Sequence, residues 1–134
     1  IKMYTKKSIY EWFKKTKSIH EKKSFFKIYI DYPRNELLER ISARSKKMVE
    51  KGAVSEVKRF IKIKIPKNKS APKAIGINEI KEYLQKKTEI KDVIEKISIK
   101  TRQYAKRQST WARGNMKDWN KINPNHLNKF LKKI

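Results

Sequence analysis

Apolar side chains recur every three or four positions along most of this chain, and this spacing predicts mainly helical structure. The longest such run begins near Glu89, with Thr88 as a plausible N-cap, and is expected to close at Gly114. At about 100° per residue, one face of this helix collects an apolar stripe. Its members are Ile90, Val93, Ile94, Ile97, Thr101, Tyr104, Ala105, Gln108, Trp111 and Ala112. We therefore expect this face to lie in the core.

Shorter helices are expected on both sides of the long one. They cover residues 3–15, 34–51, 53–63 and 77–85. Gly52 separates the second from the third, because glycine readily adopts the left-handed conformation that ends a helix. Near the end of the chain, Asn123 and Pro124 are typical of a cap followed by a first-turn proline, and they predict a last short amphipathic helix.

One stretch has the character of a strand rather than a helix. Residues 25–32, FFKIYIDY, are rich in aromatic and β-branched side chains and are closed by Pro33. A lone strand cannot form a sheet, so we expect it to join strands that this sequence lacks. The first residue, Ile1, also indicates a piece of a longer protein. Such a piece, with apolar faces uncovered, is expected to be only marginally stable.

The chain is expected to form a single domain over residues 1–134, with an internal basic loop at 64–74 and a C-terminal tail with a short helix at 114–134. Its 37 Lys and Arg against 13 Asp and Glu give a net charge of +24. Such a charge indicates an anionic partner, most simply a nucleic acid. The abundance of lysine, isoleucine and asparagine could reflect a general compositional bias, so the placement of arginine is the better guide.

Composition also narrows the class of protein. There is no cysteine, and His20 and His126 lie far apart without metal-spaced partners, so no metal site is expected within this chain. No apolar run approaches the ~20 residues of a membrane span, and no signal peptide is visible. The cytoplasm is the default location. A basic helix lying on a membrane surface is a weaker alternative, because the charge is spread over the entire chain.

The segment TRQYAKRQSTWAR, residues 101–113, concentrates arginine on the long helix. Three of the seven arginines of the chain fall here, and guanidinium groups suit phosphate better than lysine does. Arg102, Lys106 and Arg113 lie opposite the apolar stripe, which fits either an ordinary solvated face or a basic ridge laid along an anion. Gln108, at the centre of the stripe, needs a hydrogen-bond partner, and this favours the functional interpretation.

Two arginines of the expected 34–51 helix differ in their surroundings. Arg44 falls at the edge of the apolar stripe, about 60° from Ile41. It either snorkels or pairs with a carboxylate of this chain, or it points into a cleft to neutralise a ligand phosphate. Arg40 follows Glu36 by four residues, so a surface ion pair is its expected role.

In order along the chain, these pieces resemble the tRNA dimethylallyltransferases, also called tRNA isopentenyltransferases. The resemblance rests on IYEWFKKTKSIHE, PRNELLERISARSKKMVEKGAVSEVKRF, KAIGINEIKEYL and TRQYAKRQSTWAR, and the last of these is the most specific. It covers most of the chain. Departures from the family pattern are Ile77 for tyrosine, Ala112 for phenylalanine and Lys73 for arginine.

The resemblance implies transfer of a dimethylallyl group from dimethylallyl diphosphate to the N6 amine of the adenosine 3′ of the anticodon. It implies a P-loop NTPase-like α/β core with an inserted helical domain, and Mg²⁺ in the full-length enzyme. No GxxxxGK[ST] motif occurs in this sequence. The chain would thus be a mainly α-helical C-terminal fragment. Its one strand, 25–32, would belong to a core whose N-terminal half is missing, and the fragment alone would be inactive, with no cofactor of its own.

The resemblance also assigns site residues. Arg44 matches a catalytic arginine at the diphosphate, where a preorganised cation would stabilise the charge that builds during transfer. The residues matching tRNA-contacting regions are Pro72, Lys73, Ala74, Ile75, Gly76, Ile77, Lys106, Arg107, Gln108, Ser109, Thr110, Trp111, Ala112 and Arg113. Lys106, Arg107 and Arg113 would hold backbone phosphates, and Gly76 would allow RNA close to its backbone. For Gln108 and Trp111, roles in the core remain an alternative.

The implied partners are a tRNA anticodon stem-loop and dimethylallyl diphosphate, with no membrane and a monomeric chain. A rival hypothesis is a non-catalytic basic helical module that binds structured RNA. Arg44 separates the two, because an RNA-binding module gives no reason for an arginine bordering a core stripe, whereas a diphosphate site does.

Overall fold

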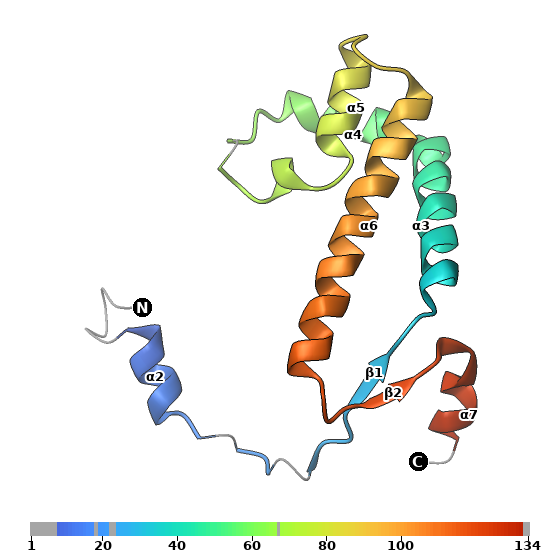
Figure 1. Cartoon of the computed structure of the whole chain (residues 1–134). Helices are drawn as coiled ribbons and strands as arrows, with labels where there is room; N and C mark the ends of the chain where they lie inside the picture. Colours follow the sequence, from blue (N-terminus) through green and yellow to red (C-terminus); the bar gives the residue numbers. More distant parts are fainter. Residues whose placement is uncertain (1–7, 18, 22–23, 67, 133–134) are drawn as a thin grey trace.

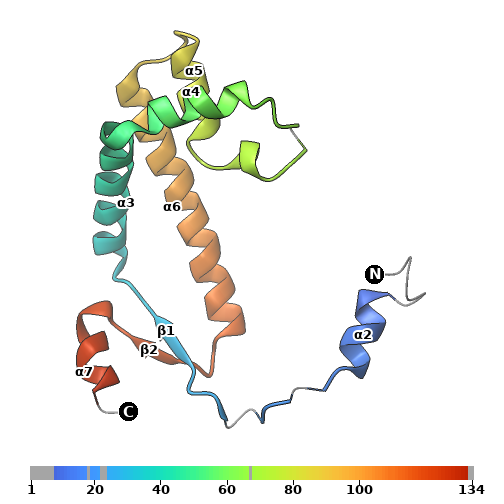
Figure 2. The same cartoon turned by 180° about the vertical axis from the view of Figure 1, so that it is seen from behind.

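The computed structural model describes residues 8–17, 19–21, 24–66 and 68–132, and it is mainly helical, as the sequence predicts. Two helices, α3 (Arg34–Met48) and α6 (Ile90–Asn115), lie side by side and form the body of the molecule (Figure 1). A two-stranded sheet lies at one end of this pair, and α4 (Val54–Lys62) and α5 (Ile77–Leu84) lie at the other (Figure 2).

The first described helix, α2 (Ile9–Lys15), lies apart from this body (Figure 1). Ser8 caps it: its hydroxyl accepts the backbone N–H of Glu11 at 3.3 Å, and the Glu11 carboxylate accepts the N–H of Ser8 in return. The expected helix began at residue 3, but residues 3–7 lie outside the described part of the chain. The apolar side chains Ile9, Trp12 and Phe13 are more than a third exposed.

Gly52 interrupts the run of helix after the strand, in agreement with the sequence prediction. Its φ of +102° is left-handed, a conformation that glycine adopts at little cost. Residues Val49–Ala53 join α3 to α4 across a kink, and Gly52 is the residue of this segment with non-helical φ and ψ. Across this junction the chain changes direction, and the predicted pair of helices is confirmed as α3 and α4.

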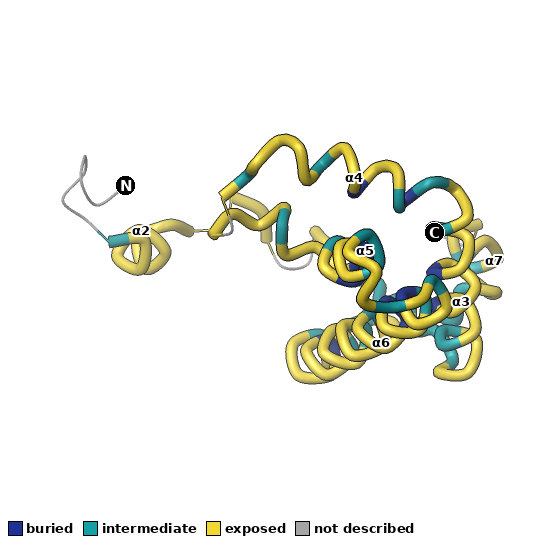
Figure 3. The backbone as a smooth tube through the Cα atoms, turned by 90° about the horizontal axis from the view of Figure 1, so that it is seen from above, coloured by how far each residue is buried: buried dark blue, intermediate teal, exposed yellow. Residues whose placement is uncertain are grey.

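The core lies where α4, α5 and α6 meet. Figure 3 shows α5 between α4 and α6, with the buried positions gathered along their facing sides. The buried apolar side chains of this cluster are Ala53, Val57, Ile80, Val93 and Ile97. Further along, Ile41 and Ser45 of α3 are buried, and the Ser45 hydroxyl donates to the Ile41 carbonyl at 2.9 Å, which satisfies it locally. The first half of α6 is thus covered on its apolar face.

The two ends of α6 each differ by one residue from the prediction. Thr88 is not the N-cap: its hydroxyl donates to the Asp92 carboxylate at 3.0 Å, and Glu89 is the cap, with its N–H donating to the same carboxylate at 3.2 Å. Gly114 does not close the helix either. It has no left-handed φ, and the helix continues to Asn115, where the N–H of Met116 still donates to Ala112.

The expectation of a strand without partners in this chain is wrong. Strand β1 (Ile28–Ile30) pairs in parallel with β2 (Asn120–Ile122), with Ile28 opposite Asn120 and Ile30 opposite Ile122. β2 follows directly after α6, so the helices between the two strands form one long crossover. Little in the sequence indicates β2, because Asn-Lys-Ile carries a single apolar side chain. The strand itself is shorter than the predicted 25–32.

The tail beyond β2 agrees with its prediction. Asn123 caps a 3₁₀ turn (Pro124–His126) by accepting the N–H of Asn125 at 2.9 Å, and the short helix α7 (Leu127–Leu131) follows. The ring of Phe130 lies 5.6 Å from that of Phe26, which ties the tail to the segment before β1. The predicted tail extends to residue 134, and residues 133–134 lie outside the described part.

Candidate nucleic-acid interface

A hollow of about 550 Å³ lies where β1, the start of α3 and the second half of α6 meet. The strand and the residues after it contribute Tyr29, Ile30, Asp31 and Tyr32. Helix α6 contributes Ala105, Arg107, Gln108, Ser109, Trp111 and Ala112, with Leu37 and Met116 completing the lining. Five of the eight residues predicted in the 106–113 segment therefore converge on one concave surface, together with two tyrosines that the sequence analysis did not assign to the site.

Gln108 and Trp111 do not face a core, contrary to their place on the apolar stripe. Trp111 is 58% exposed and Gln108 is exposed, and both line the hollow. The apolar stripe continues along α6, but from Ala105 to Trp111 it borders the hollow and is not covered by packed side chains. Ala112 alone in the 106–113 segment is buried, at 4% exposure. The amide of Gln108 thus faces an accessible hollow, and not an apolar interior that would oblige it to find a protein partner.

The cations of this half of α6 have no carboxylate partner among the described residues. Arg107 lies over the ring of Tyr104, 5.7 Å from its centroid, and Arg113 donates only to the Ser109 carbonyl at 3.4 Å. Lys106 and Thr110 are exposed, with the Thr110 hydroxyl bonded to the Lys106 carbonyl. These positive charges are free to meet an external anion.

The second predicted segment, Pro72–Ile77, overlaps the end of the predicted basic loop 64–74, of which Lys67 lies outside the described residues. It starts within a 3₁₀ turn (Ala71–Lys73) and ends at Ile77, the first residue of α5 (Ile77–Leu84), directly after Gly76, whose φ is +103°. Lys73, Ala74 and Ile75 are exposed and Pro72 and Ile77 are half-buried. Gly76 itself is buried, and a Cβ on it would lie 3.5 Å from the Met48 side chain. The positive φ therefore accounts for glycine at this turn, and the approach of RNA to its backbone stays a prediction.

Two further hollows flank this segment. One of about 590 Å³ lies between α4 and residues 71–80, and it is lined mainly by apolar side chains that include Phe60, Ile75 and Ile80. The other, of about 340 Å³, is lined by Lys64, Lys73 and Lys81 around an apolar floor. None of these three lysines has an ion-pair partner among the described residues.

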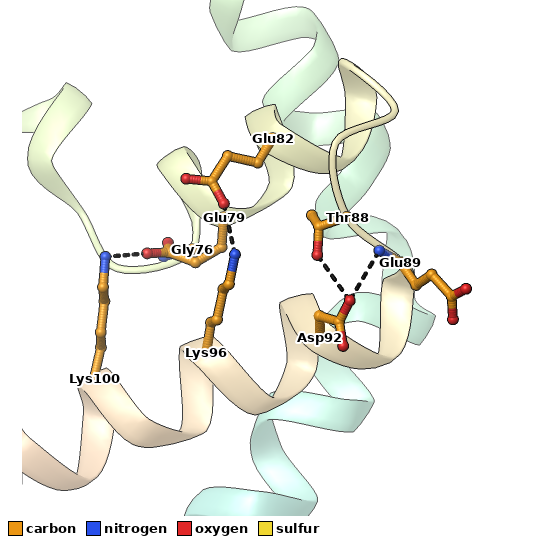
Figure 4. A network of polar contacts seen from close by, with 8 residues as sticks. All are labelled: Gly76, Glu79, Glu82, Thr88, Glu89, Asp92, Lys96 and Lys100. Atoms are coloured by element: carbon orange, nitrogen blue, oxygen red, sulfur yellow. Dashed lines mark hydrogen bonds and ion pairs between the residues drawn. The ribbon is translucent and has the colours of Figure 1, made fainter.

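A buried carboxylate fixes the turn at Gly76, and the sequence analysis did not identify it. Glu79, 3% exposed, accepts the N–H of Gly76 at 2.8 Å and the ammonium of Lys100 on α6 (Figure 4). Burial pushes the pKa of Glu79 upward. The hydrogen bonds from Lys100 and from backbone N–H groups, together with the Lys100 charge, outweigh burial and hold that pKa below its usual value. The sequence signal for this contact was the spacing of three residues between Gly76, before α5, and Glu79, which is typical of a helix cap.

Arg40 and Arg44 of α3 do not form the ion pairs considered from the sequence. Arg40 lies over the Tyr32 ring at 5.0 Å, and no pair with Glu36 exists in the described structure, because stacking on the ring replaces it. Arg44 is exposed and pairs with no described carboxylate, so pairing within the chain is excluded for the described residues. Arg44 lines none of the three hollows above.

Among the described residues, no group of three or more His, Cys, Asp or Glu side chains is placed to hold a metal ion. His20 packs edge-on against Phe25, and His126 is exposed. Within the same part of the chain, every helix is too short or too polar to cross a membrane.

Comparison with known proteins shows the family to which this chain belongs. The family model described as IPP transferase matches residues 1–115. The tRNA dimethylallyltransferase of Pelagibacter ubique (strain HTCC1062) is 48% identical over 134 residues, which is 100% of this chain and 43% of the relative. That of Agrobacterium fabrum (strain C58) is 42% identical over 89 residues, covering 66% of this chain and 30% of the relative. The chain thus spans less than half the length of these curated relatives.

Two solved structures share the fold. The full-length tRNA isopentenylpyrophosphate transferase of Bacillus halodurans is 30% identical, with a TM-score of 0.67 over 85% of this chain and 36% of that one. The tRNA delta(2)-isopentenylpyrophosphate transferase of Staphylococcus epidermidis is 25% identical, with a TM-score of 0.69 over 99% of this chain and 46% of that one.

Proposed function

The chain belongs to the IPP transferase family, and on that premise we propose that it is the tRNA-binding C-terminal portion of a prenyltransferase. The full enzyme transfers a dimethylallyl group from dimethylallyl diphosphate to the N6 amine of the adenosine 3′ of the anticodon. The observation that supports this function most directly is the hollow at β1 and α6, on which the specific 101–113 motif converges with aromatic side chains.

The hollow suits one nucleobase of the RNA. A base inside a stacked loop cannot reach a donor, so it has to leave the stack and enter a partly apolar, partly polar site. Trp111, Tyr29 and Tyr32 offer aromatic faces on which a base can stack. The Gln108 amide and the Asp31 carboxylate supply the acceptors and donors that can read the edge of a base.

Phosphates of the same RNA would be held by Arg107, which lines the hollow, and by Lys106 and Arg113 on the opposite face of α6. All three side chains are exposed and have no carboxylate partner among the described residues, so binding costs no ion pair. Such contacts read no base, but they fix the register of the RNA on the hollow, which supplies the selection. The Pro72–Ile77 segment would contact the RNA through its exposed residues Lys73, Ala74 and Ile75.

In this proposal Arg44 contacts the diphosphate. It is exposed on α3 and pairs with no carboxylate of the described residues, so its guanidinium is available to an anion whose charge grows as the dimethylallyl group departs. The phosphate-binding loop, the general base and the Mg²⁺ ligands would come from outside this chain, which alone is expected to be inactive. The full enzyme is expected to act as a cytoplasmic monomer.

The experiment that tests the RNA-binding role compares two stem-loops across a range of salt concentrations. One carries the anticodon loop with adenosine 3′ of the anticodon, and the other carries the same stem with a scrambled loop. We expect a preference for the native loop that persists as salt rises, because base contacts are screened less than phosphate contacts. Trp111→Ala and Arg113→Ala should each reduce this preference.

Arg102→Ala is the matched control, since Arg102 lies on the same helix, is exposed, and stands outside the 106–113 segment. It removes the same charge as Arg113→Ala and should weaken both stem-loops equally. Equal binding of the two loops by the parent chain, lost steeply with salt, would overturn the proposal. That result would favour a non-catalytic basic module, consistent with the net charge of +24.

A further inference from the structure

We propose that Glu79 and Lys100 are positioning residues that fix the Pro72–Ile77 segment to α6, and thereby set its place relative to the 106–113 segment. The inference rests on the proposed function and names how two separate RNA-contacting segments are held in one arrangement. Neither residue contacts RNA in this proposal. They act through Gly76, which belongs to one segment, and through α6, which carries the other.

The turn at Gly76 needs an internal acceptor. Its N–H is buried with the rest of the residue and would be costly to leave without a partner. The Glu79 carboxylate, one turn into α5, accepts it at 2.8 Å. The Gly76 carbonyl accepts the N–H of Ile80 at 3.0 Å, so the same residue also starts the helix. Both the backbone N–H and the carbonyl of Gly76 are therefore hydrogen-bonded to residues of α5.

The second oxygen of the carboxylate is bound from α6. Glu79 Oε1 accepts the Lys100 ammonium, while Oε2 accepts the Gly76 N–H, so one side chain connects the turn to the long helix. Lys100 precedes Lys106 by six residues on a continuous α-helix, which corresponds to about 9 Å along its axis. A helix transmits such a spacing with little deformation.

Holding α5 against α6 does not by itself require this buried pair. The two helices already share the core residues Ile80, Val93 and Ile97. They are also joined by an exposed ion pair between Glu82 and Lys96, 2.8 Å apart and one turn from the buried pair (Figure 4). What distinguishes Glu79 is its bond to Gly76. It is also the one carboxylate that is buried in the described part of the chain.

The Glu82–Lys96 pair gives a matched control, because it joins the same two helices without touching Gly76. Glu79→Gln and Glu82→Gln each remove one negative charge, and Lys100→Met and Lys96→Met each remove one positive charge. If only net charge mattered, the two glutamine variants would bind RNA more tightly by the same factor, and the two methionine variants would bind it more weakly by the same factor. In Glu79→Gln, however, the amide NH₂ faces a donor at either Gly76 or Lys100, and one contact is lost.

The experiment measures binding of the 134-residue chain to the native and scrambled anticodon stem-loops, below the melting temperature of every variant. We expect Glu79→Gln and Lys100→Met to lose the native-loop preference by about fivefold or more. Glu82→Gln and Lys96→Met should keep it. Lys100→Arg, which retains the cation, should restore most of the preference. The amide proton resonance of Gly76 should shift in Glu79→Gln and stay in place in Glu82→Gln.

The inference is overturned if Glu79→Gln prefers the native loop as strongly as Glu82→Gln, or if all four variants lose preference only in proportion to their melting temperatures. If Glu79→Gln does not fold, Lys100→Met serves as the test variant, because the Lys100 side chain is half exposed and its replacement leaves no cavity. If the parent chain shows no native-loop preference, the proposed function fails, and this inference fails with it. A preference in the parent that survives in Glu79→Gln removes the positioning role alone.

Discussion

The two halves of helix α6 carry the same apolar periodicity, but they serve different ends. In the first half Val93 and Ile97 are fully buried, and Lys96 and Lys100 are neutralised by carboxylates of α5. In the second half Tyr104, Gln108 and Trp111 are exposed. The cations there have no carboxylate partner among the described residues.

The difference shows that a helical stripe identifies a face and leaves open what lies opposite. The first half packs against α5, and its apolar residues form one core cluster with residues of α4 and α5. The second half has the short strand β1 and the start of α3, which leave a hollow. The first half of the helix thus belongs to the core, and in the proposed function the second half binds a ligand. The following predictions test this difference.

The largest expected effect is on stability in the first half. Ile97→Ala removes a side chain that is 2% exposed and should lower the free energy of unfolding by about 2–5 kcal/mol, since it leaves a cavity in the core. Trp111→Ala removes a larger side chain from the second half, but it should cost far less, because Trp111 is exposed. Urea unfolding of the two variants decides this. A greater loss for Trp111→Ala would contradict the division of α6.

A second comparison concerns the effect on stability of replacing Gly76, at the start of α5, and Gly114, within α6. Gly76→Ala places a side chain at a left-handed φ and should cost about 1–3 kcal/mol. The Cβ itself would meet Met48 and Ile97 only at ordinary contact distances, so the backbone and not space sets this cost.

Gly114→Ala should have the opposite sign. Gly114 lies within α6 without a left-handed φ and with open space around it, so alanine should stabilise by about 0.5–1 kcal/mol. Thermal melting of the two variants compares the signs directly. A destabilising Gly114→Ala would mean that Gly114 ends the helix after all.

A smaller effect is expected from pH. The pKa of Glu79 is lower in the folded chain than in the unfolded one, so folding favours its ionised form. Its contribution to stability is therefore present above the unfolded pKa, near 4.5, and is lost as pH falls through the lower folded pKa. Unfolding curves of the parent and Glu79→Gln should converge over this acid range. A difference between the two that stays constant with pH would contradict the assignment.

The smallest effect is expected at the exposed pair of Glu82 and Lys96. Both side chains are about half exposed, and such pairs contribute little. Lys96→Met should change stability much less than Lys100→Met, and its effect should disappear at high salt because exposed charges are screened. Melting curves at low and high salt measure this. Equal, salt-independent losses for the two lysine variants would show that burial of Glu79 does not matter.

Local sequence features predicted most of the elements correctly. Periodicity indicated α3, α4, α5 and α6, Gly52 marked the break between helices, and Asn123 with Pro124 marked the last one. Each of these signals acts within a few residues of the structure that it specifies. The errors at Thr88 and Gly114 amount to one residue each, because competing hydrogen bonds at a helix end are decided by small energies.

The α6 residues that line the hollow mostly belong to the predicted 106–113 segment, but the shape of the hollow and its other lining residues were not predicted. The 101–113 motif pointed to the residues of α6 that line the hollow, because their order is specific. Tyr29, Asp31 and Tyr32 were missed as site residues, since nothing in their local sequence places them beside α6. The same is true of Glu79, whose partner Lys100 lies on another helix.

The sequence by itself determined the helical periodicity, the positive charge and the motifs that identify the family, because these depend on residue types and short spacings. Only the tertiary structure decided that β1 pairs with β2, that Gln108 and Trp111 face a hollow, and that one buried carboxylate joins the Gly76 turn to α6. These features depend on contacts between residues far apart in the chain. Whether an apolar face becomes core or binding surface depends on what the rest of the chain places against it.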